Sequence, residues 1–344
     1  MKPTSKTHSR VQKLRQLLQG RSHLLVVLQD NPDPDAIASA MALRKLSNSL
    51  SSVRCTITHA GTIGRGENRA LVHYLGVELR PCSEIDFGQF DLVALVDTQP
   101  GTGNNPLAET IVPDIVVDHH PLRQATRRAQ LIDIRKDYGA TATILLEYLI
   151  EAGLTPETPL ATALLFAIRS DTQDLEREAS RADIEAVGFL FPIANKRMLG
   201  KIQRGRVQRA YFHMLAQALR NARVHGRCIS TRLGQIDNPD MIAEVADLLL
   251  REDQTDWTMC TGFSQGKLFI SIRTSQEDLR ADRVIHAVVA GKGTGGGHQA
   301  YAGGQIPANL GTESERQTLE RLVHKRFCRA VGAAPERGEK LIDD

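Results

Sequence analysis

Short apolar runs that alternate with helical patterns dominate the first half of this sequence and constrain its fold more than any other feature. Runs rich in valine, leucine and isoleucine occupy residues 23–28, 53–59, 92–96 and 115–117, and residues 36–46 have helical spacing. Continuously apolar strands interleaved with helices are typical of a parallel sheet covered on both faces. The sequence therefore predicts an α/β domain with a parallel, Rossmann-like sheet.

The second half of the chain has a different pattern. After residue 139 the spacing becomes helical, and further along residues 257–263 and 267–274 have the alternation of a hairpin. These features predict a smaller α+β domain, joined to the first by a helical linker. The predicted boundaries are 22–194 for the first domain, 195–224 for a basic helical linker and 225–335 for the second domain.

Composition excludes several classes of protein. Of the 344 residues, 41% are apolar and 24% are charged, and the five cysteines form no CxxC pair. These values exclude disordered and disulfide-rich chains, and the cysteine spacing does not predict a zinc site. The apolar runs at 24–28 and 161–168 are shorter than the roughly 20 residues of a membrane span. We therefore expect a cytoplasmic protein that does not associate with membranes.

The net charge of +3 conceals two basic stretches. Residues 1–21 contain six lysines or arginines and no acid, and residues 195–232 contain ten more, again without an acid. Such stretches are typical of a surface that faces phosphate groups or an acidic protein, and also of a solvated helical face. The sequence leaves both interpretations open.

Acidic residues follow three of the predicted strands. Three aspartates come soon after residues 24–28, one follows 92–96, and an aspartate with two histidines follows 115–117. The carboxyl ends of parallel strands meet at one edge of a sheet, where ligands bind, so these groups should converge. They are Asp30, Asp33, Asp35, Asp97, Asp118, His119 and His120.

Convergence of these groups has an electrostatic consequence. Two carboxylates about 4 Å apart repel by roughly 4 kcal/mol at an effective dielectric constant of 20, and divalent cations remove this penalty. A mixture of carboxylate and imidazole suits Mn²⁺ or Mg²⁺, and a carboxylate between two such ions can activate water for attack on phosphorus. Taken singly, each acid is more typical of a turn or a helix cap, with Asp35 as the N-cap. Their joint occurrence predicts a metal centre.

The order of the motifs resembles that of the DHH phosphoesterases. The motifs lie at residues 31–39, 96–98, 118–120, 139–141 and 170–172. The C-terminal Gly-Gly-Gly-His and Ala-Gly-Gly sequences resemble the signature of the DHH-associated domain, and the subgroup that the chain resembles is the nano-RNase and pAp-phosphatase proteins. The resemblance implies that the first domain is catalytic and that the second binds substrate.

The resemblance also implies two divalent cations, manganese with magnesium as the alternative. Asp97 would bridge them, Asp33 would join Asp97 on the first ion, and the second ion would be bound by Asp35, His119 and Asp171. At the position where the family has a histidine ligand for the first ion, this chain has Gln29. A glutamine carbonyl is a weaker ligand than imidazole, and Asp30 would substitute only if the strand has already ended. We therefore predict a weakened or magnesium-shifted first site.

Other residues are assigned to the substrate by the same resemblance. His120 would contact the substrate phosphate or polarise the leaving oxygen, and Asp118 would orient the histidines. The glycine run after the helical segment 279–290 favours a backbone nest for phosphate, with a tight loop as the alternative. The substrate-binding residues implied are Arg273, Gly295, Gly296, Gly297, His298 and Gly303.

Together these features predict an enzyme that hydrolyses short oligoribonucleotides or 3′-phosphoadenosine 5′-phosphate with water activated by two metal ions. Three alternatives remain: a pyrophosphatase or polyphosphatase, a cyclic-dinucleotide phosphodiesterase, and a degenerate protein that binds nucleotide without hydrolysing it because of Gln29. The sequence does not decide whether the chain forms a homodimer.

Overall fold

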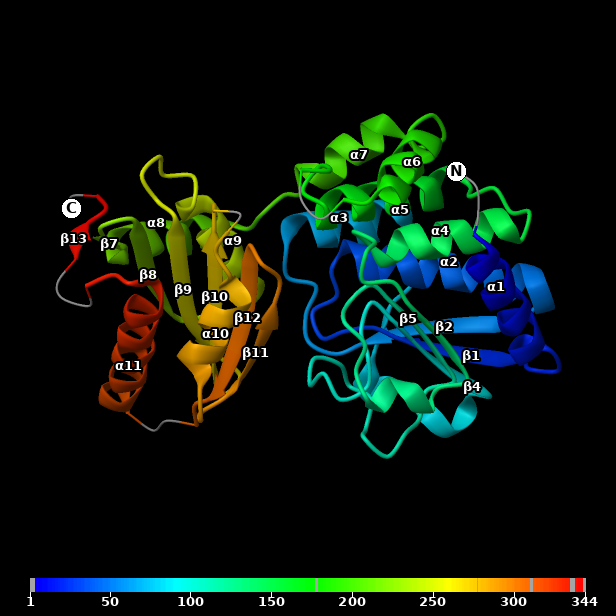
Figure 1. Ribbon diagram of the computed structural model, residues 1–344, viewed down its shortest axis with the longest axis horizontal. Coiled ribbons are helices and arrows are strands. Elements are labelled where there is room, and N and C mark those ends of the chain that lie inside the picture. The colour runs from blue at the N-terminus through cyan, green and yellow to red at the C-terminus, as the bar shows by residue number, and fades with distance from the viewer. Residues whose placement is uncertain (1–3, 177–178, 277, 310–311, 335–337, 343–344) are drawn as a thin grey trace. The chain divides into compact units, whose positions relative to one another are not determined.

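The computed structural model of the protein divides the chain into two compact units, unit 1 (residues 1–206) and unit 2 (residues 207–344). It describes residues 4–176, 179–276, 278–309, 312–334 and 338–342. Figure 1 shows both units. The predicted end of the second domain, residue 335, lies outside the described residues.

Unit 1 is built on a six-stranded parallel sheet, as predicted. The strand order is β3-β2-β1-β4-β5-β6, so β1 lies between β2 and β4. The chain therefore reverses its direction of winding between β1 and β4, and ligands bind at such a point in open α/β sheets. The strands are β1 (His23–Val27), β2 (Arg54–His59), β3 (Arg80–Pro81), β4 (Leu92–Val96), β5 (Ile115–Asp118) and β6 (Leu131–Ile134).

The two faces of this sheet are covered differently. Helices gather on one face, whereas loops and short 3₁₀ helices cover the other (Figure 1). Alternation along β1 explains this, because Leu24 and Val26 face the helical core and Leu25 and Val27 face the smaller apolar cluster under the loops. The helices are α1 (Ser5–Leu18), α2 (Pro34–Ser51), α3 (Gly66–Leu75), α4 (Thr141–Glu151), α5 (Thr158–Asp171), α6 (Arg181–Leu190) and α7 (Lys196–Gln203), with η1 (Cys82–Glu84), η2 (Phe87–Gln89) and η3 (Ala125–Arg128).

Unit 2 is a seven-stranded mixed sheet with helices on both faces, in agreement with the predicted α+β class. The hairpin of β9 and β10 turns at residues 265–266, as predicted. The order β11-β12-β10-β9-β8-β7-β13 is formed by β7 (Arg223–His225), β8 (Cys228–Gln235), β9 (Trp257–Ser264), β10 (Lys267–Thr274), β11 (Thr294–Gly297), β12 (Tyr301–Pro307) and β13 (Glu339–Lys340). The helices are α8 (Arg209–Asn221), α9 (Asp240–Leu249), α10 (Ala281–Val289) and α11 (Glu313–Val331).

The basic stretch at 195–224 is divided between the units. Its first helix, α7, packs against α3 and α5 of unit 1, and its second, α8, packs against β8 of unit 2. Residues 204–208 connect the two helices. Among the described residues, no helix has the length and apolar character needed to cross a membrane.

Candidate metal centre

The loop between β1 and α2 contributes two aspartates to the centre. Asp33 is the N-cap of α2, because its Oδ1 accepts a hydrogen bond from the Ala36 N–H at 2.9 Å. The alternative in which Asp35 caps this helix is therefore wrong. Asp35 is fully buried and accepts hydrogen bonds from the N–H groups of Thr141 at 2.7 Å and Ala142 at 2.8 Å. Its carboxylate thus lies against the first turn of α4, where the helix dipole favours negative charge.

His119, just after β5, is held in a fixed orientation. Its Nδ1 donates to the backbone carbonyl of Tyr138 at 3.1 Å. Its Nε2 lies 3.3 Å from Asp171 Oδ2 and 3.5 Å from Asp97 Oδ1. One ligand atom each from Asp35, His119 and Asp171 lies within 4.8 Å of the others. The structure therefore brings together the three residues assigned to the second metal ion, and a backbone contact aims the imidazole at the carboxylates.

Asp97 lies directly after β4, at the centre of the cluster. It is 2% exposed, and Thr141 Oγ1 donates to its Oδ1 at 3.1 Å. Ligand atoms of Asp97, Asp118, His119 and His120 form a second group within 4.8 Å. Because Asp97 and His119 each approach members of both groups, all these side chains belong to one contiguous centre.

Asp118 holds His120 rather than both histidines. Its Oδ1 accepts a hydrogen bond from His120 Nδ1 at 2.8 Å, whereas the contact found for His119 Nδ1 is to the Tyr138 carbonyl. Gln99, which sequence analysis did not single out, donates from Nε2 to Asp118 Oδ2 at 2.7 Å. Its position two residues after Asp97 could have drawn attention to it.

The side assigned to the first metal ion is less complete. Gln29 Nε2 donates to Asp33 Oδ2 at 2.8 Å, so the amide presents its N–H₂ group to the carboxylate. Among the described residues, neither Asp33 nor Asp30 belongs to a group of three close ligands. β1 ends at Val27, so Asp30 lies beyond the strand. Burial and, after it, the charge of Asp30 raise the pKa of the Cys82 thiol.

Three carboxylates of the centre, those of Asp33, Asp35 and Asp97, resist ionisation. Burial, with the charge of Asp171, raises the pKa of Asp35 to about 8 and also raises the pKa of Asp33. Burial and the charge of Asp35 raise the pKa of Asp97 well above its usual value. Although burial acts to lower the pKa of His119, contact with Asp171 raises it to about 10. The buried carboxylates hold protons because too little positive charge lies near them. Divalent cations would supply that charge and replace the protons, so the cluster fits a metal site.

These pKa shifts predict how stability depends on pH. Both Asp35 and His119 bind protons more tightly in the folded state than in the unfolded state, so their contribution to the free energy of unfolding is present at low pH. It is lost as the pH rises from about 4 to 8 for Asp35, and from about 6.5 to 10 for His119. The melting temperature of the metal-free protein should therefore fall between pH 5 and pH 9, and Mn²⁺ should raise it more at pH 8 than at pH 5. Thermal unfolding in chelator and in Mn²⁺ measures both effects; an equal Mn²⁺ shift at the two pH values would contradict the assignment.

The predicted substrate residues of unit 2 are largely engaged within that unit. Arg273 is 9% exposed, pairs with Asp247 and donates to Ser271 Oγ at 2.8 Å. Its guanidinium carbon lies 5.6 Å from the centre of the Tyr301 ring. The His298 N–H donates to the Tyr301 carbonyl at 2.8 Å. These contacts fix the arginine and the histidine near one aromatic ring.

The predicted backbone nest at residues 295–297 is wrong. These glycines form β11 and pair with β12, with Gly295 opposite Gly304 and Gly296 opposite Gly303. A Cβ atom on Gly295 would lie 2.8 Å from a side-chain carbon of Ile285 in α10. Gly295 therefore permits close packing of α10 on this edge strand.

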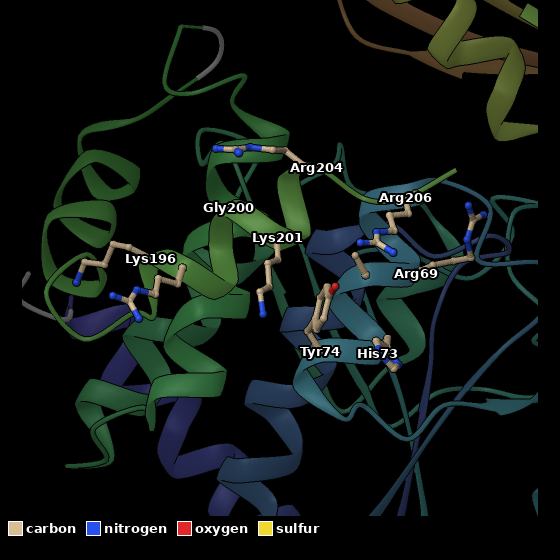
Figure 2. A pocket seen from close by; sticks show the side chains of 11 residues that line it. Arg69, His73, Tyr74, Lys196, Gly200, Lys201, Arg204 and Arg206 are labelled. Atoms are coloured by element: carbon tan, nitrogen blue, oxygen red, sulfur yellow. The ribbon is translucent and has the colours of Figure 1, made fainter. Parts of the chain in front are cut away.

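A basic groove lies between α3 and α7 in unit 1 (Figure 2). It has a volume of about 910 Å³, and none of the described residues that line it is acidic. The Lys201 ammonium lies 5.5 Å from the Tyr74 ring centre. Asn68 of α3 donates to the Pro32 carbonyl at 3.3 Å, so α3 borders the loop that carries Asp33. The lining residues are Gly66, Arg69, Ala70, His73, Tyr74, Lys196, Arg197, Gly200, Lys201, Arg204 and Arg206.

A buried ionic network around Arg135 is connected to the candidate metal centre through Tyr138. Arg135 donates to Glu147 Oε2 and Asp133 Oδ2, each at 2.7 Å, and to Thr7 Oγ1 of α1 at 3.0 Å. It also donates to Tyr138 Oη at 3.1 Å. The Tyr138 carbonyl accepts a hydrogen bond from His119 Nδ1, so this network helps to position His119.

Comparisons with known proteins match both halves of the chain. The pattern of the DHH family, N-terminal domain, matches residues 23–168, and that of the DHHA1 domain matches residues 225–327. An uncharacterized protein of Methanocaldococcus jannaschii is 34% identical over 322 residues, which are 92% of this chain and 66% of that protein. A probable manganese-dependent inorganic pyrophosphatase of Deinococcus radiodurans is 34% identical over 174 residues, which are 48% of this chain and 52% of that protein.

Solved structures show the same fold. An exopolyphosphatase-related protein from Bacteroides fragilis superposes with a TM-score of 0.72 at 12% identity, covering 94% of this chain and 98% of that one. RecJ from Thermus thermophilus in complex with Mn²⁺ gives a TM-score of 0.54 at 15% identity, covering 95% of this chain and 55% of that one.

This chain spans slightly less than two thirds of the length of the archaeal relative and about half of the length of the pyrophosphatase.

Proposed function

Because this chain carries an N-terminal domain of the DHH family followed by a DHHA1 domain, we propose that it is a metal-dependent phosphoesterase. One observation supports the proposal above all. The imidazole of His119 is aimed by a backbone carbonyl at the buried carboxylate of Asp97 and the partly exposed carboxylate of Asp171, which lie 3.5 and 3.3 Å away. When bound at such a centre, divalent cations supply hydroxide at neutral pH and stabilise charge on phosphoryl oxygens.

The side chains have distinct roles in this proposal. Asp35, His119 and Asp171 would hold one cation, and Asp97 would serve both it and a second cation beside Asp33. His120 is the most exposed member, with a side chain 41% exposed, and its Nδ1 donates to Asp118. In this proposal the imidazole of His120 donates a hydrogen bond to a substrate phosphate or to the departing oxygen.

We propose short oligoribonucleotides and 3′-phosphoadenosine 5′-phosphate as substrates, the substrates of the subgroup that the motifs resemble. The basic groove supports an anionic substrate, because its many cations and lack of acids attract phosphate groups. The likeness to the pyrophosphatase relative covers 48% of this chain, so it does not by itself favour pyrophosphate as the substrate.

Turnover of a defined panel tests this proposal. The full chain is incubated in Mn²⁺ with a labelled 5′-phosphorylated diribonucleotide, 3′-phosphoadenosine 5′-phosphate, a cyclic dinucleotide and pyrophosphate. We expect mononucleotides from the first compound and phosphate from the second. Hydrolysis of pyrophosphate alone would overturn the substrate assignment. Nucleotide binding without any turnover would overturn the hydrolase itself and favour the degenerate alternative.

Replacing Gln29 by histidine is expected to lower the Mn²⁺ concentration needed for half-maximal activity. An imidazole nitrogen binds Mn²⁺ more strongly than an amide oxygen does, and the glutamine now presents its N–H₂ group to Asp33. The expected change is about tenfold, the lower end of what altered contacts at a metal site cost. Metal titration of the rate measures it, with the exposed Gln19→His as the control. An unchanged metal requirement together with an unchanged rate would show that the first site does not depend on residue 29.

A further inference from the structure

A second group of metal-ligating side chains lies in unit 2. It consists of His225 at the end of β7 and of His324 and Cys328 on α11. One ligand atom from each lies within 4.8 Å of the others. These residues are separate from the carboxylate centre of unit 1, and the proposed phosphoesterase chemistry does not use them.

Two elements of secondary structure build this group. His324 and Cys328 are four residues apart on α11, a spacing that places both on one face of a helix and that paired metal ligands use. His225 is opposite Cys228 in the antiparallel pairing of β7 and β8, so both lie on the same face of the sheet. Ser230, two residues further along β8, lies on this face too, and its Oγ is 3.2 Å from His324 Nδ1. That face is therefore the one covered by α11.

The contacts orient the ligand atoms toward one another. His324 Nε2 lies 3.5 Å from Cys328 Sγ, while its Nδ1 faces the serine hydroxyl. The His225 and His324 rings are 4.8 Å apart, centre to centre. Cys328 is fully buried, whereas both histidines are partly exposed, so an ion could reach the group from the histidine side. The serine contact fixes one ring nitrogen of His324 and leaves the other to the ion, as a hydrogen bond from outside the ligand set commonly does.

We propose that His225, His324 and Cys328 bind a zinc ion that links β7 to α11. Two imidazoles and a thiolate suit Zn²⁺, whereas the oxygen-rich centre of unit 1 suits Mn²⁺ or Mg²⁺. Water would fill the fourth position of such a site. The sequence carries no recognisable signal for this site because the first ligand lies about a hundred residues from the other two, far from the short spacings of known zinc motifs.

This ion has a structural role. β7 has three residues, and its neighbour β13 has two. A zinc ion held by β7 and α11 would fasten this short-stranded side of the sheet to the helix that covers it. Binding to the folded state alone raises stability with ligand concentration, so Zn²⁺ should raise the melting temperature of the full chain even when the unit 1 centre is disabled.

Metal content and cobalt spectroscopy of the full chain test the proposal. In Asp97→Asn, which disables the unit 1 centre, we expect one zinc ion per chain after dialysis against excess Mn²⁺. Substitution by Co²⁺ should give an absorption band from thiolate-to-metal charge transfer. Cys328→Ser should abolish the band, and His225→Gln should weaken zinc binding at least about tenfold. Cys55→Ser, in unit 1, should retain both properties.

The outcomes separate this site from the first. No zinc in the wild type, or a cobalt band that survives Cys328→Ser, would overturn the proposal. Circular dichroism identifies a variant that fails to fold, and the partly exposed His225 provides a second variant outside the core. Since zinc content and the cobalt band do not depend on turnover, a failure of the phosphoesterase proposal would leave this test unaffected.

Discussion

Replacing Asp97 by asparagine is expected to lower metal-dependent phosphoester hydrolysis by at least about a thousandfold, or about 4 kcal/mol of activation free energy. The residue is the buried carboxylate that approaches both histidines and that is proposed to be shared between the cations. Asparagine is the informative replacement because the backbone here has φ of 57°, a left-handed conformation that asparagine tolerates. Steady-state rates with the diribonucleotide measure the effect.

Asp97→Asn should stabilise the metal-free protein, although it lowers activity. Removing one of several carboxylates that repel one another relieves the cost that raises the pKa of Asp97, so the melting temperature in chelator should rise while the gain on adding Mn²⁺ shrinks. The exposed Glu109→Gln removes a charge outside the centre and should change neither property. Substantial turnover by Asp97→Asn would contradict the proposed role of this residue.

Replacing Arg135 by alanine is expected to lower the free energy of unfolding by about 3–5 kcal/mol. The arginine side chain is 5% exposed and lies between Asp133 and Glu147, whose side chains are 0% and 3% exposed. Without it, the buried Glu147 loses this positive partner and Asp133 is left with the half-exposed Lys6, 3.1 Å away. A buried carboxylate without its partner costs far more than an intact pair contributes. Chemical denaturation of the full chain, followed by circular dichroism, measures the difference.

A surface ion pair provides the matched control. Arg181 donates to Glu185 on α6 with a side chain that is 92% exposed, so Arg181→Ala should change the free energy of unfolding by less than about 1 kcal/mol. Arg135→Ala should also weaken Mn²⁺ binding, because Tyr138 would lose a contact that helps to place the carbonyl facing His119. A loss of stability no larger than that of the control would show that the buried network contributes little.

The acidic residues of the centre could be predicted because buried parallel strands leave a strong pattern. Asp97 directly follows an uninterrupted apolar strand, and Asp118 is the last residue of another. The sheet order then places their ends together. Asp171, by contrast, ends α5 and was assigned through the family resemblance alone, since nothing in its neighbourhood distinguishes it from a capping residue.

The groups that hold these ligands could not be predicted in the same way. Asp35 is held by the N–H groups of Thr141 and Ala142, and His119 by the carbonyl of Tyr138. Every residue has a backbone N–H or carbonyl, so composition gives no signal for such contacts, which depend on where α4 begins.

Glycine runs misled the sequence analysis for a related reason. Conformational freedom favours a loop, and three successive glycines at 295–297 predict a nest for phosphate. The residues packed against these glycines give them a different role. The side chain of Ile285 packs so close to the strand that Gly295 and Gly304 have no room for a Cβ atom. At Gly295 and Gly304 the property used is lack of bulk, whereas Gly297, with φ of 155°, also uses the backbone freedom of glycine.

The helix at the start of the chain limits how the protein can be shortened. A fragment that began at residue 23, where the family match begins, would lack α1. It would uncover the apolar surface now packed against Val11, Leu14 and Leu18, and it would remove the hydroxyl of Thr7 from the buried arginine. Such a fragment should aggregate during expression, so an affinity tag is best placed ahead of α1, with every residue of that helix retained.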